Sequence, residues 1–129
     1  MSDLSGEWDG HFDYPAGLGP STPFIAAIRQ QGTHVSGTIT EPDLYTDAAP
    51  AEAAIEGIVS GGTVDFTKTY RRASEGYETP VDYTGRILDD GTRILGHWSV
   101  VEMTGTFEMT KREERAAARS REEALERTR

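Results

Sequence analysis

One short pattern recurs along most of the chain: a hydrophobic residue, any residue, a glycine, any residue and a second hydrophobic residue. In an extended chain, alternate side chains point to the same face, so each copy places a glycine between two large inward residues. Each copy therefore predicts a β-strand. The six copies are Trp8, Gly10 and Phe12; Val35, Gly37 and Ile39; Ile55, Gly57 and Val59; Tyr83, Gly85 and Ile87; Ile94, Gly96 and Trp98; and Met103, Gly105 and Phe107, and a seventh, Phe24, Ala26 and Ile28, has alanine at its centre.

The alternation of hydrophobic and polar residues predicts eight strands, with no helical periodicity between them. Gly32-Thr33, Gly61-Gly62 and Asp89-Asp90-Gly91 are signals for tight turns, and three of the other connections are longer. The predicted strands cover residues 5–14, 23–31, 34–40, 53–60, 63–72, 80–88, 92–101 and 103–111.

Consecutive strands joined by hairpins predict an all-β fold, an eight-stranded antiparallel up-and-down barrel, because closure removes the exposed edges of an open sheet. Central glycines fit this prediction, since a residue without a Cβ relieves crowding where a strand bends. Residues 1–112 would form the barrel domain. Residues 113–129 would form a charged tail, helical or frayed, because Leu125 is its one large hydrophobic residue.

The longer connections, at 15–22, 41–52 and 73–79, fall at one end of such a barrel, and the tight turns fall at the other. The barrel would thus resemble a cup with its mouth at the loop-rich end, where ligands of small barrels bind. The interior side chains could leave a cavity or fill it completely. They are Trp8, Phe12, Phe24, Ile28, Val35, Ile39, Phe66, Ile87, Trp98, Phe107 and Met109.

Few polar side chains share the inward positions, and the most unusual is Lys68, a cation between Phe66 and Tyr70. A buried charge requires a partner. Lys68 could bind a carboxylate or enolate of a ligand, act as a base or form a Schiff base, or extend to the rim or to a glutamate there. The candidate ligand-binding residues are Tyr14, Phe24, Phe66, Lys68, Tyr70, Tyr83 and Trp98.

Gly6-Glu7-Trp8 opens the first strand, and a basic residue, Lys111 or Arg112, follows the last. In these features the chain resembles the lipocalin and avidin group of calycin-type barrels, in which Gly-x-Trp stands at this place and lipocalins lay an arginine over the tryptophan. The resemblance implies a lumen for a small, largely apolar molecule. The chain departs from these families in having no cysteines. Biotin binding is not implied, because Asp9, His11 and Asp13 are predicted to face outward.

Charge and composition narrow the function further. The net charge is −9, although residues 111–129 carry seven basic residues against five glutamates, and an acidic barrel argues against nucleic-acid binding. No apolar run is long enough to span a membrane and no signal peptide precedes the barrel, so a cytoplasmic location is expected. His11, His34 and His97 show no metal-ligand spacing, and no cofactor is expected.

Three functions remain open at this point. The first is a lipocalin-like carrier or sensor that binds a small apolar or aromatic molecule. The second is a small barrel cyclase or isomerase, in which Lys68 or Tyr83 polarises a carbonyl. The third is a filled barrel that mediates protein–protein interaction. Outward-facing Ile25, Ala27, Leu95 and Val101 could also support a homodimer.

Overall fold

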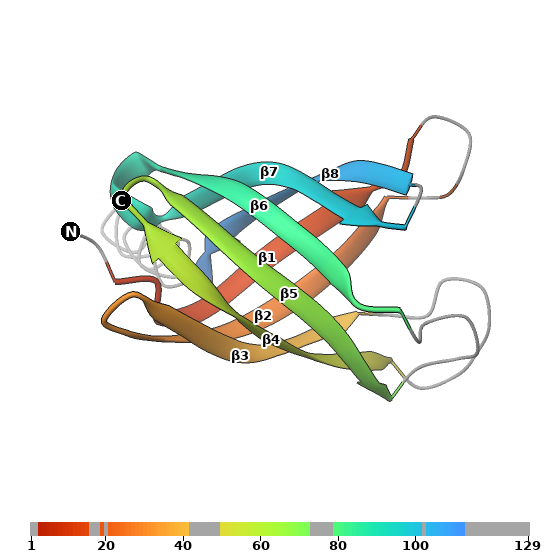
Figure 1. Cartoon of the computed structure of the whole chain (residues 1–129), viewed down its shortest axis with the longest axis horizontal. Coiled ribbons are helices and arrows are strands. Elements are labelled where there is room, and N and C mark those ends of the chain that lie inside the picture. Colours follow the sequence, from red (N-terminus) through yellow and green to blue (C-terminus); the bar gives the residue numbers. More distant parts are fainter. Residues whose placement is uncertain are drawn as a thin grey trace, which may run out of the picture.

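Every strand in the computed structural model of this protein pairs with the next one along the chain, and the last strand pairs with the first (Figure 1). All of these pairings are antiparallel, and the pairing of the first strand with the last closes the sheet into a barrel. The structure describes residues 3–15, 19, 21–41, 50–72, 79–101 and 103–112. The elements are β1 (Gly6–Asp13), β2 (Thr22–Gln31), β3 (His34–Glu41), β4 (Ala51–Ser60), β5 (Thr63–Arg72), β6 (Val81–Leu88), the short 3-10 helix η1 (Asp89–Gly91), β7 (Arg93–Val100) and β8 (Met103–Lys111).

The predicted eight-stranded up-and-down barrel is confirmed, and each strand ends within two residues of its predicted position. The largest difference lies between β3 and β4, where Glu41 and Ala51 still pair although the sequence suggested a loop. Asp89 and Asp90 both have positive φ angles and form η1 in place of a two-residue hairpin turn. The predicted tail, residues 113–129, lies outside the described residues.

The two ends of the barrel differ in their connections (Figure 1). Tight turns join β2 to β3 and β4 to β5 at one end, which we call the closed end, and Gln31 pairs with His34 there. The mouth is the opposite end, where β3 ends at Glu41 and β6 begins at Val81. This is the arrangement that the connection lengths predicted.

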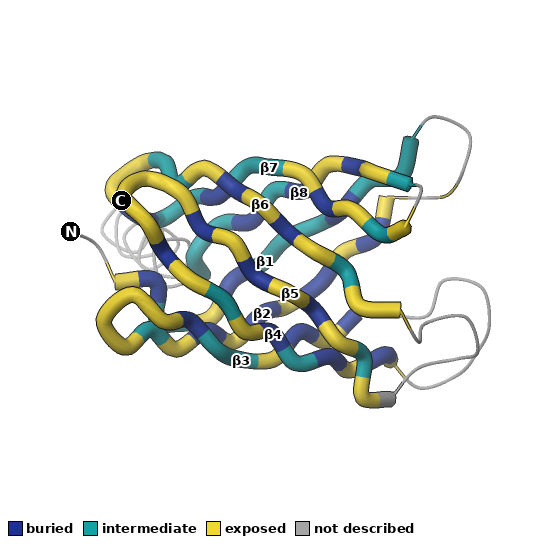
Figure 2. Tube along the Cα trace, in the orientation of Figure 1, coloured by how far each residue is buried: buried dark blue, intermediate teal, exposed yellow. Residues whose placement is uncertain are grey.

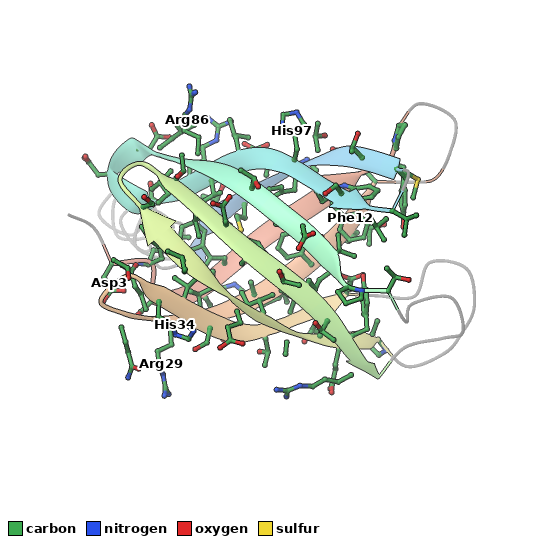
Figure 3. The ribbon with its side chains drawn as sticks, viewed as in Figure 1. Asp3, Phe12, Arg29, His34, Arg86 and His97 are labelled. Carbon is green, nitrogen blue, oxygen red and sulfur yellow. The ribbon has the colours of Figure 1, made fainter. Side chains whose placement is uncertain are left out.

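Burial alternates along the strands, as expected for a barrel with one packed and one wet face (Figure 2). In β2, Phe24, Ala26 and Ile28 are buried, whereas Ile25 and Ala27 between them are exposed. Ten of the eleven predicted interior residues are buried, and Ile87 is half-buried. Figure 3 shows four charged or polar side chains pointing away from the barrel: Arg29, His34, Arg86 and His97.

Three of the six central glycines, Gly10, Gly85 and Gly105, lie where rings from neighbouring strands pack, and the other three lie closest to neighbouring backbone atoms. A Cβ added to Gly10 would collide with the ring of Phe24, and one added to Gly105 would collide with the ring of Trp98. Because glycine alone permits this approach, the recurring pattern allows the waist of the barrel to fill with aromatic side chains.

Residues from both ends of the barrel domain meet at the closed end. Trp8 is fully buried, and its indole Nε1–H donates a hydrogen bond of 2.9 Å to the carbonyl oxygen of Leu4, which is also buried. Lys111 Nζ donates to the carbonyl oxygen of Asp3 at 2.9 Å. The other basic residue, Arg112, forms an ion pair of 2.7 Å with Asp9 on the outer face. Lys111, the last residue of β8, and Arg112, which follows it, thus make contacts that hold the closed end together.

The outward hydrophobic residues are spread over the surface. Ile25 and Val101 are exposed, and Leu95 is half-buried. His11 in β1 and Glu108 in β8 face outward and pair with each other. Their two strands separate β7, which carries Leu95, from β2, which carries Ile25. These residues therefore form no single patch, and the homodimer stays a prediction that the mass of the protein in gel filtration would test.

Candidate ligand-binding site at the mouth of the barrel

Lys68 meets a glutamate inside the barrel. Its position in β5 is inward, on the same face as the buried Phe66 and Val64, which lie two and four residues before it. Lys68 Nζ lies 2.8 Å from Glu41 Oε2, with both side chains at most 3% exposed. Glu41 is the last residue of β3, so the ion pair joins β3 to β5 across the inner face of β4, which lies between them.

Two tyrosines complete the hydrogen bonding of this ion pair. The hydroxyl of Tyr70 donates to Glu41 Oε1 at 2.6 Å, so each carboxylate oxygen has a donor. Lys68 Nζ donates a second hydrogen bond, of 2.8 Å, to the hydroxyl oxygen of Tyr83. A buried ion pair is tolerated only when its remaining polar atoms are satisfied in this way.

Aromatic rings surround the ammonium group of Lys68. Its Nζ lies 4.7 Å from the ring centroid of Phe12, 4.8 Å from that of Tyr70 and 5.1 Å from that of Tyr83. Phe12 belongs to β1, which lies across the lumen from β5, so the cation is held near the centre of the barrel. The negative faces of aromatic rings attract a cation most strongly when water is excluded, as it is here.

Burial shifts the acid–base properties of this network. It lowers the pKa of Lys68, and the neighbouring Glu41 carboxylate partly offsets that effect. Burial also raises the pKa of Tyr83 well above its ordinary value, and the negative charge of Glu41 raises it further. Tyr83 therefore keeps its phenolic proton throughout the physiological pH range and can donate it.

A cavity of about 220 Å³ lies against this network at the mouth. An engineered cavity of about 150 Å³ in another protein binds benzene, so the mouth cavity has room for a molecule of one or two rings. Its walls are mostly apolar and aromatic. The lining residues are Phe12, Tyr14, Lys68, Tyr70, Thr79, Val81, Tyr83, Trp98, Val100 and Met103.

Three of the lining rings pack edge-to-face against one another. The ring centroids of Tyr14 and Trp98 are 5.4 Å apart, and Phe12 lies 5.6 Å from Tyr14 and 6.2 Å from Trp98. The indole Nε1–H of Trp98 donates to the carbonyl oxygen of Asp13 at 3.1 Å, which fixes the orientation of that ring. This wall is thus preorganised for contact with a flat apolar molecule.

Five of the seven predicted ligand-binding residues line this cavity: Tyr14, Lys68, Tyr70, Tyr83 and Trp98. The other two pack in the core. Phe66 stacks on Tyr83 with 4.8 Å between ring centroids, and Phe24 packs over Gly10. Neither Phe24 nor Phe66 borders the cavity. The binding role of the five that do remains a prediction.

Glu41 is the residue that the sequence reasoning missed, because it was assigned to the connection of residues 41–52. The signal was present in the alternation of β3. Val35, Gly37 and Ile39 occupy the inward positions, and Glu41 stands at the next one. A glutamate that continues an inward series was the partner required by Lys68.

Compared with known proteins, the chain matches no family model and no curated protein sequence. The likeness to lipocalins and avidins is therefore one of barrel architecture. Among the described residues, no three histidine, aspartate or glutamate side chains are grouped so that they could hold a metal ion. The same part of the chain contains no helix with the length and apolar character needed to cross a membrane.

Proposed function

We propose that this protein binds a small apolar or aromatic molecule in the mouth cavity, as a lipocalin-like carrier or sensor does. The observation that carries the proposal is the cavity of about 220 Å³ whose wall combines aromatic rings with a fully buried ion pair. Buried ion pairs add little net stability compared with well-packed hydrophobic residues. A buried pair that borders a cavity is better explained by function than by folding.

The size of the cavity sets the scale of the expected affinity. A ligand of one or two rings has about 10 non-hydrogen atoms, each of which can contribute roughly 0.3–1.5 kcal/mol. The wall is preformed, since Trp98 is held by Asp13 and Lys68 by Glu41. The binding free energy should therefore lie between about −3 and −15 kcal/mol, and a value of about −8 kcal/mol corresponds to a dissociation constant of about 1 μM.

A second candidate is a small cyclase or isomerase that acts on a bound carbonyl compound. It is favoured by the proximity of Lys68 Nζ to the hydroxyl of Tyr83, 2.8 Å apart on the cavity wall. Two adjacent donors can polarise a carbonyl, and a narrow cavity can hold a flexible substrate in a reactive conformation. If the protein converts a bound compound into an isomer, chromatography will show a new peak of the same mass. That result would favour this candidate over a carrier.

The test of the binding proposal is calorimetric titration of the wild-type protein and two variants with indane, a two-ring hydrocarbon. Val81→Trp fills the cavity from its wall, whereas Ile58→Trp adds the same ring at an exposed outer position of β4. We expect Val81→Trp to weaken binding at least tenfold and Ile58→Trp to leave it unchanged. Equal affinity in a folded Val81→Trp variant, or no binding to the wild-type protein, would contradict the proposal.

A further inference from the structure

We infer that the ligand of the mouth cavity carries a neutral hydrogen-bond acceptor, typically a carbonyl group, directed at Tyr83 and Lys68. This inference rests on the proposed binding function and specifies the chemical class of the ligand. Three properties of the cavity wall support it: its charge balance, its existing cation and its hydrogen-bond donors.

The charge of the wall is already balanced. Lys68 carries one positive charge and Glu41 one negative charge, with their atoms 2.8 Å apart and both side chains buried. A ligand carboxylate would lose its hydration and gain no uncompensated positive charge in return. Near Lys68 it would also be repelled by the carboxylate of Glu41, which is held in place by a hydrogen bond from Tyr70. Acidic ligands are therefore disfavoured.

The place for a cation is already occupied. The rings of Phe12, Tyr70 and Tyr83 surround Lys68 Nζ at 4.7–5.1 Å, the arrangement that aromatic cages use for ammonium ligands. An amine ligand would meet the charge of Lys68 at the same place. Positively charged ligands are therefore disfavoured as well, and a neutral molecule remains.

The hydrogen bonds of the network leave donors unused. Both oxygens of Glu41 accept, from Lys68 and from Tyr70. Lys68 has three N–H groups, of which one goes to Glu41 and one to Tyr83. The oxygen of Tyr83 accepts, so its own proton is directed elsewhere, and no hydrogen-bond acceptor for it is found among the described residues.

Tyr83 and Lys68 both line the cavity, and we infer that the remaining O–H and N–H are available to a ligand acceptor. A carbonyl oxygen has two lone pairs and can receive both donors, whereas a pure hydrocarbon leaves them without a partner. A buried hydrogen bond of this kind changes an equilibrium by about tenfold. The cavity should therefore discriminate between molecules that share a ring frame and differ in this one group.

The experiment compares three probes on one frame: indane, 1-indanone and indane-1-carboxylate, each titrated into the wild-type protein at pH 7. We expect 1-indanone to bind about tenfold tighter than indane, and the carboxylate to bind more weakly than either. Tighter binding of the carboxylate, or equal binding of indane and 1-indanone, would overturn the inference and leave the binding function standing. Failure of all three to bind would overturn both.

Tyr83→Phe keeps the ring and removes the hydroxyl. This variant should lose most of the preference for 1-indanone over indane. The infrared carbonyl stretch of bound 1-indanone gives an independent measurement. It should lie at lower frequency in the wild-type complex than in a hydrocarbon solvent, which shows hydrogen bonding even if the variant does not fold. An unshifted stretch in the wild-type complex would overturn the inference.

Discussion

Glu41, the last residue of β3, and Lys68, in the second half of β5, form a buried ion pair whose carboxylate oxygen and ammonium nitrogen are 2.8 Å apart. The pair lies between the packed waist of the barrel and the cavity at its mouth. It balances the charge of the cavity wall and orients two tyrosine hydroxyls through hydrogen bonds. Removal of either partner alone should destabilise the barrel, and on our proposal the pair also determines which ligands the cavity accepts.

Lys68→Met should destabilise the protein strongly, because it leaves the carboxylate of Glu41 buried without a cation. Removal of one partner from a buried pair costs about 3–5 kcal/mol, measured as the free energy of unfolding in urea. The double variant Glu41→Leu, Lys68→Met should recover most of that loss. Arg93→Met is the control, because its ion pair with Glu108 is partly exposed and should contribute at most about 1 kcal/mol.

Tyr83 should make the protein sensitive to alkaline pH. Its pKa is raised by burial above the ordinary value of 10.0, so the folded state holds this proton more tightly than the unfolded state. The resulting stability is fully present below about pH 10 and is lost as the pH rises from there toward the pKa of the folded state. Tyr83→Phe should therefore lose less stability than the wild-type protein between about pH 9 and pH 11.

Lys68 acts in the opposite direction. Burial lowers its pKa below the ordinary value of 10.5, so its contribution to the free energy of unfolding increases as the pH rises toward 10.5. Both proteins in the comparison retain Lys68, so the difference between them reports on Tyr83. Absorbance at 295 nm follows tyrosine ionisation directly. Complete ionisation of all five tyrosines in the folded protein near pH 10 would contradict the assignment.

The glycine pattern should be essential for packing at the waist. Gly105→Ala would force the added Cβ against the Trp98 ring and the carbonyl oxygen of Asp13, and overpacking of this kind costs about 1–3 kcal/mol or more. Gly62→Ala is the matched control, because no atom lies within 4 Å of its added Cβ. Thermal melting of both variants checks this prediction. Equal melting temperatures would show that the waist has room for the added Cβ.

Val101 should be a strained position at the rim of the mouth. Its φ angle is +43°, a conformation that β-branched residues rarely adopt, and its side chain is 89% exposed. Val101→Gly should therefore raise the free energy of unfolding by about 1 kcal/mol, because glycine adopts this conformation without strain. Val101→Ala, which keeps the Cβ and removes the branch, should gain less. A loss of stability in Val101→Gly would contradict the assignment of strain.

The strands and the inward positions could be predicted from the sequence, because a period of two fixes which side chains share a face, and the two ends of the barrel could be predicted from the lengths of the connections. Lys68, Tyr70 and Tyr83 were predicted to be candidate ligand-binding residues for this reason. Glu41 was missed because a charged residue beside a proline resembles the start of a loop. The cavity could not be predicted, since it depends on whether rings such as Phe24 and Phe66 turn into the waist or toward the mouth.

The most direct test of the central claim is the location of bound indane in solution. Intermolecular nuclear Overhauser effects from the protein saturated with indane should connect its protons to the methyl groups of Val81, Val100 and Met103, which line the cavity. That result would place the molecule inside the mouth. Contacts to the exposed methyl groups of Ile25 or Ile58 instead, or no contacts at saturating concentration, would contradict binding in the cavity.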